Sequence, residues 1–146
     1  MVLYALYVFS RAGNCIHYQD WNRGSKEPMT AADLESNQKL CYGLLFSLKR
    51  FCARTSPLVE DQGVFRTYTC TAYRLHYYDV PTGLKIVVMS DPRVDYLGDD
   101  LLVKLYHIYV DTCSRNPLYV LNSPITHSSF IDASAALITS HKSFSK

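Results

Sequence analysis

The sequence lacks the short signatures of nucleotide, metal and redox sites. Its six glycines lie at positions 13, 24, 43, 63, 83 and 98, too far apart for a dinucleotide-binding fingerprint or a phosphate-binding P-loop. Its five cysteines are odd in number and form no C-x-x-C pair, which argues against a disulfide framework and a standard zinc site. We therefore expect no cofactor and no metal, and we interpret the cysteines as small buried residues of a protein in a reducing compartment.

The chain also has little net charge and no long apolar run. Its formal net charge of +2 is far below the basic surplus of nucleic-acid-binding domains, so we expect no nucleic acid partner. No stretch reaches the ~20 apolar residues of a membrane-spanning helix. The apolar N-terminus MVLYALYVFSR has no basic residue before its apolar run, so no signal peptide is expected. These features predict a cytoplasmic protein.

What the sequence does contain is a globular composition that is rich in tyrosine. Hydrophobic residues make up 48% of the 146, and 12 are tyrosines, a residue type enriched in half-buried strands and at interfaces. This length suits one domain with a real core. We expect a single domain over residues 1–146, with a core over about 2–140 and flexible last residues.

Two segments, 2–9 and 84–89, are apolar on both alternating faces. Strands of that kind lie at the centre of a sheet and are covered on both sides. Residues 15–21 follow the first segment across a turn that contains Gly13 and Asn14, both suited to positive φ. The chain is therefore predicted to open with a hairpin.

Two further strands are predicted over 64–70 and 72–79, where apolar and polar residues alternate. Val80-Pro81-Thr82-Gly83 then has the residue order of a type I turn with a glycine bulge. Together with residues 84–89 these strands form an antiparallel meander. The tyrosines and histidine of YRLHYYDVPTGLKIVVMSD are thus interpreted as packing side chains of a hairpin and not as a reactive cluster.

The first helix is expected to follow a polar loop over 22–33, to start at Thr30 with Asp33 as a capping pair, and to end near Arg54. Its core stripe at helical spacing comprises Leu40, Cys41, Leu44, Leu45, Leu48, Phe51 and Cys52. Tyr42, Phe46 and Ala53 widen the apolar surface beyond the roughly 100° of an ordinary surface helix. We expect this helix to cover its own sheet and to meet a partner as well.

Two more helices complete the predicted order ββαβββαα. One spans about 97–115, with Asp99 and Asp100 in its first turn; Leu101, Leu105, Ile108 and Thr112 form its main stripe, and Leu102, Tyr106, Tyr109 and Cys113 widen it. The other starts at Ser123-Pro124 and carries Phe130, Ile131, Leu137 and Ile138. The predicted class is α/β (α+β), a five-stranded antiparallel sheet sandwiched between helices.

Candidate catalytic groups are few. Cys15 and His17 share one face of a strand, but a metal site would need two more ligands, and only His76 is available from a strand expected to lie nearby. His76 and Asp79 fall on opposite faces of their strand, which argues against an acid–base pair, and no Ser or Cys sits on a nucleophile elbow. We expect no catalytic residues, and the protein is predicted not to be an enzyme.

Three segments together resemble a known family. LYVFSRAGNCIHYQDW, KLCYGLLFSLKRF and above all YRLHYYDVPTGLKIVVMSD are similar to the family of the smallest subunit of the TRAPP vesicle-tethering complex, over roughly residues 2–91, and NPLY at 116–119 continues the likeness. The resemblance implies a longin-like (sedlin-type) fold, whose ββαβββαα order agrees with the order derived above from the residues.

The resemblance further implies a non-catalytic subunit that lies beside a second longin-like subunit and beside acylated-fold TRAPP subunits. Such a core acts as guanine nucleotide exchange factor for a Rab-family GTPase in ER-to-Golgi transport, as a peripheral assembly on ER and cis-Golgi membranes. The exchange activity belongs to the assembled surface. On the first helix, we hypothesise that Tyr42, Phe46, Lys49 and Arg50 contact a neighbouring subunit, because exposed apolar patches mark interfaces.

Other classes of protein share parts of this pattern. A SNARE longin domain would continue into apolar heptads and a membrane anchor, whereas this sequence ends in a polar tail. A small adaptor-type coat subunit shares the strand order but not the hairpin motif. A stand-alone profilin-like or longin-like peptide- or SNARE-binding module stays open as an alternative. A small hydrolase or transferase would need clustered polar groups in a pocket, for which the sequence offers no candidates.

Overall fold

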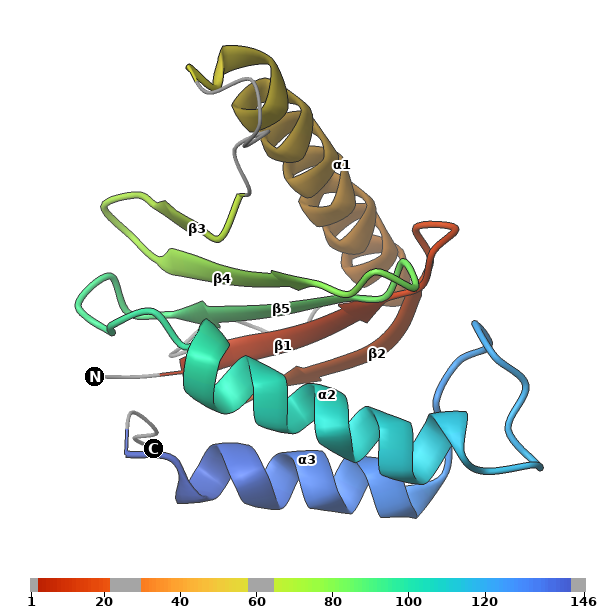
Figure 1. Ribbon diagram of the computed structural model, residues 1–146. Coiled ribbons are helices and arrows are strands. Elements are labelled where there is room, and N and C mark those ends of the chain that lie inside the picture. The colour runs from red at the N-terminus through yellow and green to blue at the C-terminus, as the bar shows by residue number, and fades with distance from the viewer. Residues whose placement is uncertain (1–2, 22–29, 58–64, 143–146) are drawn as a thin grey trace. The chain divides into compact units, whose positions relative to one another are not determined.

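The computed structural model describes residues 3–21, 30–57 and 65–142 (Figure 1). Parts of three expected features, namely residues 22–29 of the polar loop, residue 64 and the last four residues, lie outside the described residues. The chain divides into two compact units. Residues 1–24 and 67–146 form the sheet unit, and residues 25–66 form the α1 unit.

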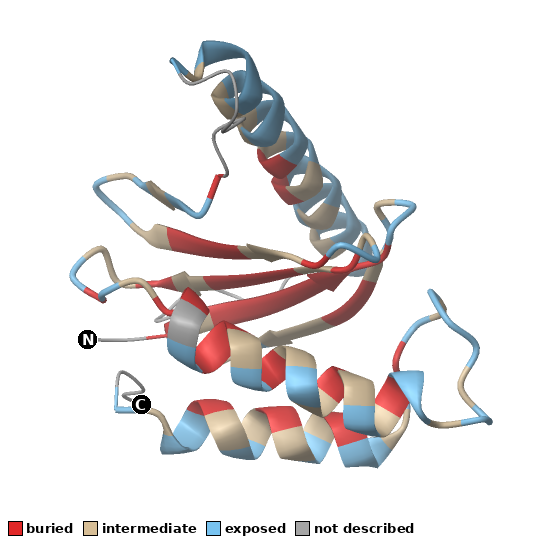
Figure 2. Cartoon of the chain, in the orientation of Figure 1, coloured by how far each residue is buried: buried red, intermediate tan, exposed pale blue. Residues whose placement is uncertain are grey.

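The sheet unit contains a five-stranded antiparallel sheet, as the sequence predicts. Its strands lie in the order β2-β1-β5-β4-β3. Their bounds are β1 Leu3–Phe9, β2 Cys15–Asp20, β3 Thr67–Thr69, β4 Arg74–Asp79 and β5 Lys85–Ser90. The two strands that are apolar on both faces, β1 and β5, pair with each other at the centre, where burial on both sides is greatest (Figure 2). At the edge, β3 is shorter than the predicted 64–70.

The turn between β4 and β5 confirms the predicted glycine bulge. Gly83 has φ +98°, its N–H donates to the Val80 carbonyl at 2.8 Å, and the Val80 N–H donates to the Leu84 carbonyl at 2.9 Å. A side chain at position 83 would also have no room, because the Arg11 side chain lies against this glycine. In the first hairpin Gly13 has φ +90°, whereas Asn14, also expected to suit positive φ, does not adopt it.

Two helices cover one face of the sheet (Figure 1). The first is continuous over three segments, η1 Gly98–Leu102, α2 Val103–Tyr109 and η2 Val110–Ser114, and the second is α3 Ser128–Ser140. Their apolar side chains pack with the strands in one core cluster that includes Leu6, Val8, Ile86, Val88, Leu101, Leu105, Phe130 and Ile138. This face of the sheet thus supplies the core of the unit.

The extent of the 98–114 helix agrees with the prediction, but its buried stripe differs. Ile108 and Thr112, predicted in the main stripe, are only partly buried, and the buried residues are Leu101, Leu102, Leu105, Tyr109 and Cys113. π-helical turns lie at both ends of this helix, where the Leu102 N–H donates to the Leu97 carbonyl and the Arg115 N–H to the Val110 carbonyl.

The predicted start of the last helix at Ser123-Pro124 is wrong. Helix α3 begins at Ser128, with His127 in the cap position. The residues before it are held elsewhere, because the Ile125 N–H donates to the Ile16 carbonyl of β2 at 2.8 Å and the Ser123 hydroxyl donates to the Val120 carbonyl. The serine that resembled a helix cap instead closes a turn. Phe130 and Ile138 are buried as predicted.

In the α1 unit, helix α1 spans Ala31–Thr55, which confirms the predicted extent. The Thr30 side chain accepts the Asp33 N–H at 3.2 Å, as the capping pair requires. Cys41 and Leu45 are buried, but Leu40 and Phe51, predicted in the core stripe, are 71% and 62% exposed. At roughly 100° per residue, Leu40 and Phe51 point about 120–140° away from Leu45, beyond the width of one buried stripe.

Candidate interaction surface

The side chains predicted to meet a partner lie on one side of α1. At roughly 100° per residue, Tyr42, Phe46, Lys49 and Arg50 share an arc of about 100° that begins beside the buried Leu45. Phe46 is 56% exposed, Lys49 and Arg50 are exposed, and Tyr42 is half-buried. We call these four residues the α1 surface. It combines an exposed ring with two cations on a single helix face.

Charge on the α1 surface has one sign. Lys49 and Arg50 follow Phe46 by three and four residues, the spacing at which helix side chains are neighbours. Lys39 falls within the same arc, but its ammonium group pairs with the Glu35 carboxylate at 3.1 Å. This face therefore presents an aromatic ring and two basic side chains within one arc.

The sheet separates the residues that the sequence suggested as candidate catalytic or metal-binding groups. His17 lies on β2 and His76 on β4, with β1 and β5 between them, so the expectation that His76 comes from a neighbouring strand is wrong. Cys15 donates to the backbone carbonyl of His17, and burial raises the pKa of its thiol to about 11. A thiol of that kind stays protonated and is a poor nucleophile or ligand. No cluster of three metal-ligating side chains occurs in residues 3–21, 30–57 or 65–142.

The buried histidines are held in the neutral form. His76 is fully buried, its Nδ1 accepts the Leu97 N–H at 3.3 Å, and its Nε2 lies 2.7 Å from the Ser90 hydroxyl. Burial, together with the Arg74 charge, lowers the pKa of His76 to about 4. His17 packs edge-on against the Phe130 ring at 5.0 Å, and burial lowers its pKa to about 4 as well. His76 packs within the fold, as the sequence predicts for the hairpin cluster.

A second candidate surface, which the sequence reasoning missed, lies in the sheet unit after η2. Leu118, Val120 and Leu121 are 91%, 73% and 59% exposed. We call residues 116–122 the apolar loop. The signal for it was present, because Asn116-Pro117 and Asn122-Ser123-Pro124 are turn formers that bracket the segment LYVL. Because a turn lies on each side of it, this apolar segment cannot extend the preceding helix into the core.

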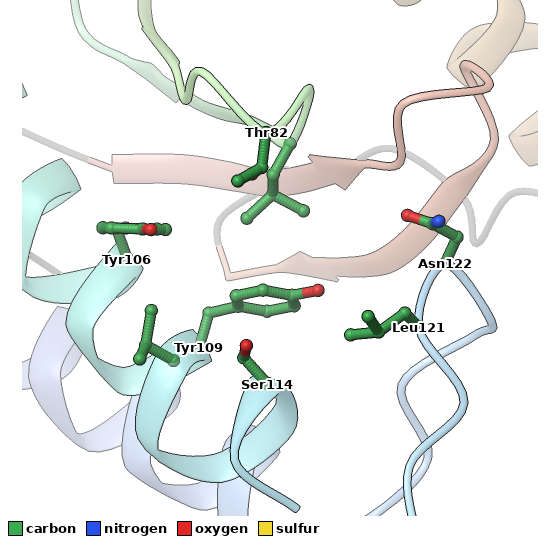
Figure 3. Close-up of a pocket in the computed structure, with 8 residues that line it drawn as sticks. Thr82, Tyr106, Tyr109, Ser114, Leu121 and Asn122 are labelled. Atoms are coloured by element: carbon green, nitrogen blue, oxygen red, sulfur yellow. The ribbon is translucent and has the colours of Figure 1, made fainter.

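A pocket of about 170 Å³ opens beside the apolar loop (Figure 3). Its lining comes from the β4–β5 turn, from the end of the long helix and from the loop, namely Thr82, Leu84, Tyr106, Tyr109, Val110, Ser114, Leu121 and Asn122. Burial is the main cause that raises the pKa of Tyr109 to about 12, so its phenol stays neutral. The lining has apolar walls with hydroxyl and amide groups and no charged side chain.

No helix in the described ranges is long and apolar enough to cross a membrane.

Comparison with known proteins places the chain among vesicle-trafficking subunits. It is 34% identical to trafficking protein particle complex subunit 1 of Dictyostelium discoideum over 145 residues, which are 99% of each chain. It is 36% identical to the human subunit 1 over 125 residues, 86% of this chain and 83% of that one. The expected resemblance is therefore confirmed, and these relatives bear the names of complex subunits, not of enzymes.

A solved structure and a family match complete the comparison. The Roadblock/LC7 domain of Streptomyces avermitilis superposes with a TM-score of 0.51 at 17% identity, over 77% of this chain and 88% of that chain. At that identity the likeness concerns the fold alone. Residues 3–141 match the Sybindin-like family. The sheet order, the hairpin motif and the nearly full-length similarity agree, and the chain belongs to the Sybindin-like family.

Proposed function

We propose that this chain is a non-catalytic core subunit of a trafficking protein particle complex, in the place of subunit 1. The observation that carries the proposal is the similarity to a subunit 1 over 99% of both chains. The protein would contribute surfaces to an assembly and no reacting groups.

The partners follow from the same proposal. They are a second longin-like subunit and acylated-fold subunits of the complex. The assembled complex would engage a Rab-family GTPase and speed its nucleotide exchange in ER-to-Golgi transport. The chain would work in the cytoplasm, bound peripherally to ER and cis-Golgi membranes through the complex.

The α1 surface is proposed as a contact with a neighbouring subunit. A helix that exposes Phe46 beside Lys49 and Arg50 leaves an aromatic ring in water, and aromatic and arginine side chains are the residue types that anchor protein interfaces. Tyr42 adds a ring with a polar tip on the same arc. A subunit that covers this arc removes the ring from water.

Co-expression with the other core subunits tests the proposal. The wild-type chain should copurify in a stoichiometric complex that speeds nucleotide release from a Rab-family GTPase. Phe46→Asp should abolish copurification, because the partner would have to bury an unpaired carboxylate. Since Phe46 is 56% exposed, the isolated variant should keep the far-ultraviolet circular dichroism of the wild type.

Ser47→Asp is the matched control. Ser47 is the next residue, is exposed, and lies roughly 100° further round the helix, outside the α1 surface. It adds the same charge and should leave assembly unchanged. A wild-type chain that stays monomeric beside the other subunits would refute the proposed function. Equal assembly of both variants would refute only the role of the α1 surface.

A further inference from the structure

The apolar loop carries three aliphatic side chains into solvent on a fixed backbone. The Tyr119 N–H donates to the Asn116 carbonyl, and the Ser123 N–H donates to the Val120 carbonyl. Side chains reinforce both turns, since Asn116 accepts the Leu118 N–H at 3.0 Å and the Tyr119 hydroxyl donates to the Ser123 carbonyl at 2.6 Å. The Tyr119 ring also packs edge-on against the His127 ring at 5.6 Å. A partner would find this loop already ordered, which lowers the entropy cost of binding.

The pocket beside the loop has the size of one large side chain. Its volume of about 170 Å³ is close to that of an engineered cavity of about 150 Å³ that binds benzene. Figure 3 shows the Tyr109 ring at its floor and Leu121 and Asn122 on the loop side. Thr82, Ser114 and Asn122 bring polar groups to the pocket, and such groups can bond the backbone of a peptide whose side chain enters it.

Two basic residues, Arg11 and Lys85, lie at the turn that forms one wall of the pocket. The Arg11 side chain lies against Gly83. In the sequence Gly83 stands between Thr82 and Leu84, which both line the pocket. Lys85 donates to the Gly83 carbonyl at 3.0 Å. On the helix side, Arg115 pairs with Asp111 at 3.5 Å. Asp79 lies opposite Lys85 in the β4–β5 register, and the Arg11 side chain beside the turn can meet a ligand with a carboxylate close to its apolar group.

The size of this surface limits what can bind there. A stable contact between folded domains buries about 800 Å² on each partner, far more than one pocket and three side chains provide. An extended segment needs less surface, because one anchoring side chain and a few backbone hydrogen bonds hold it. The occupant that fits is a peptide segment and not a second globular face.

We propose that the pocket and the apolar loop bind an extended segment of a neighbouring subunit, which inserts one aliphatic or aromatic side chain into the pocket and places an acidic residue near Arg11. Leu118 and Val120 then pack on the flanks of that side chain. This inference rests on the proposed function, because the occupant belongs to the same complex. The contact lies in the sheet unit and uses no residue of the α1 surface.

The test uses the complex reconstituted from the full-length chain and the other core subunits. Leu121→Asp places a carboxylate at the pocket and should weaken the affinity for the other subunits roughly tenfold or more, the effect of losing one buried aliphatic contact. Arg11→Glu should weaken it as well. Thr126→Asp, at an exposed residue just beyond the loop, is the control and should change nothing. All three isolated variants should keep the wild-type melting temperature.

A photoreactive phenylalanine analogue at position 118 identifies the occupant. It should crosslink to an extended segment of one subunit that holds an acidic residue within a few positions of an aliphatic or aromatic one. The same analogue at position 46 serves as the positive control for assembly. Unchanged affinity in Leu121→Asp and Arg11→Glu, or crosslinks from position 118 to a helical face only, would overturn the inference while the proposed function stands. If the wild-type chain itself does not assemble, the proposed function fails first.

Discussion

Acidification should destabilise the protein through its two buried histidines. Both have an ordinary pKa of 6.5 that burial lowers to about 4 in the folded chain. The unfolded chain binds a proton on each histidine below pH 6.5, whereas the folded chain stays neutral until about pH 4. The contribution of these two histidines to the unfolding free energy is therefore fully present above pH 6.5 and is lost as the pH falls from 6.5 to 4. Below pH 4 the histidines cause no further loss.

The magnitude follows from the proton difference. In the window each histidine contributes a slope of about 1.4 kcal/mol per pH unit. A change from pH 7 to pH 5 uses about 1.5 units of the window and should cost roughly 2 kcal/mol for each histidine, or roughly 4 kcal/mol for both. That is a large part of the 5–15 kcal/mol that stabilises a typical domain. Asp91 titrates below this range, because hydrogen bonds from Arg93 lower its pKa to about 2.

The geometry of His76 explains why the folded chain resists the proton. Since Nδ1 accepts the Leu97 N–H, a proton on Nδ1 would face another donor and break that bond. Arg74 on the same strand adds a like charge, and the imidazole is fully buried, with the Tyr96 ring stacked at 6.2 Å. The added proton on Nδ1 would therefore be both unpaired and buried.

Urea unfolding followed by circular dichroism at pH 5, 6 and 7 measures this effect. His76→Gln keeps a donor and an acceptor but does not titrate, so its loss of unfolding free energy between pH 7 and pH 5 should be roughly 2 kcal/mol smaller than that of the wild type. His107→Gln, at an exposed residue of α2, provides the comparison for removing a histidine at the surface. An equal loss in wild type and His76→Gln would refute the reasoning.

Two further substitutions test the packing of the sheet unit. Gly83→Ala should lower the unfolding free energy by roughly 1–3 kcal/mol, because φ is +98° and an added Cβ would lie 2.6 Å from the Arg11 Cγ. The double variant Gly83→Ala with Arg11→Ala should recover only part of this loss. An unchanged urea midpoint for Gly83→Ala would contradict the strained turn. Phe130→Ala should cost about 3–5 kcal/mol, since Phe130 is 1% exposed and packs edge-on against His17 and Tyr109. A loss below about 1 kcal/mol for Phe130→Ala would mean that α3 contributes little to the core.

The local elements were predictable because their causes lie within a few residues. Thr30 and Asp33 are three positions apart, and this spacing alone sets the start of α1. Gly83 occurs where the bulge after a type I turn requires positive φ, so the β4–β5 hairpin follows from four letters. The excess apolar width of α1 was also visible, and Phe46 is exposed as that width requires.

The errors share one cause, which is competition from distant groups. Ser123-Pro124 has the letters of a helix start, but the adjacent Ile125 binds the backbone of β2, which lies more than a hundred residues earlier in the chain. Leu40 and Phe51 satisfy an apolar pattern, yet a buried stripe accepts only residues close to the direction of Leu45. The apolar loop escaped prediction although turn formers bracket it, because the apolar run by itself gives no sign of which side water will occupy.

By itself, the sequence determined the kinds, order and approximate limits of the strands and helices, together with the two hairpin turns and the family resemblance. These depend on alternation, helical spacing and turn residues, which act over short distances. Only the tertiary structure decided that the strands lie in the order β2-β1-β5-β4-β3, that His17 and His76 are held apart, and that Leu121 meets Thr82 and Tyr109 at one pocket. The physical reason is that contacts between distant segments depend on the packing of the whole core, which no short stretch of residues contains.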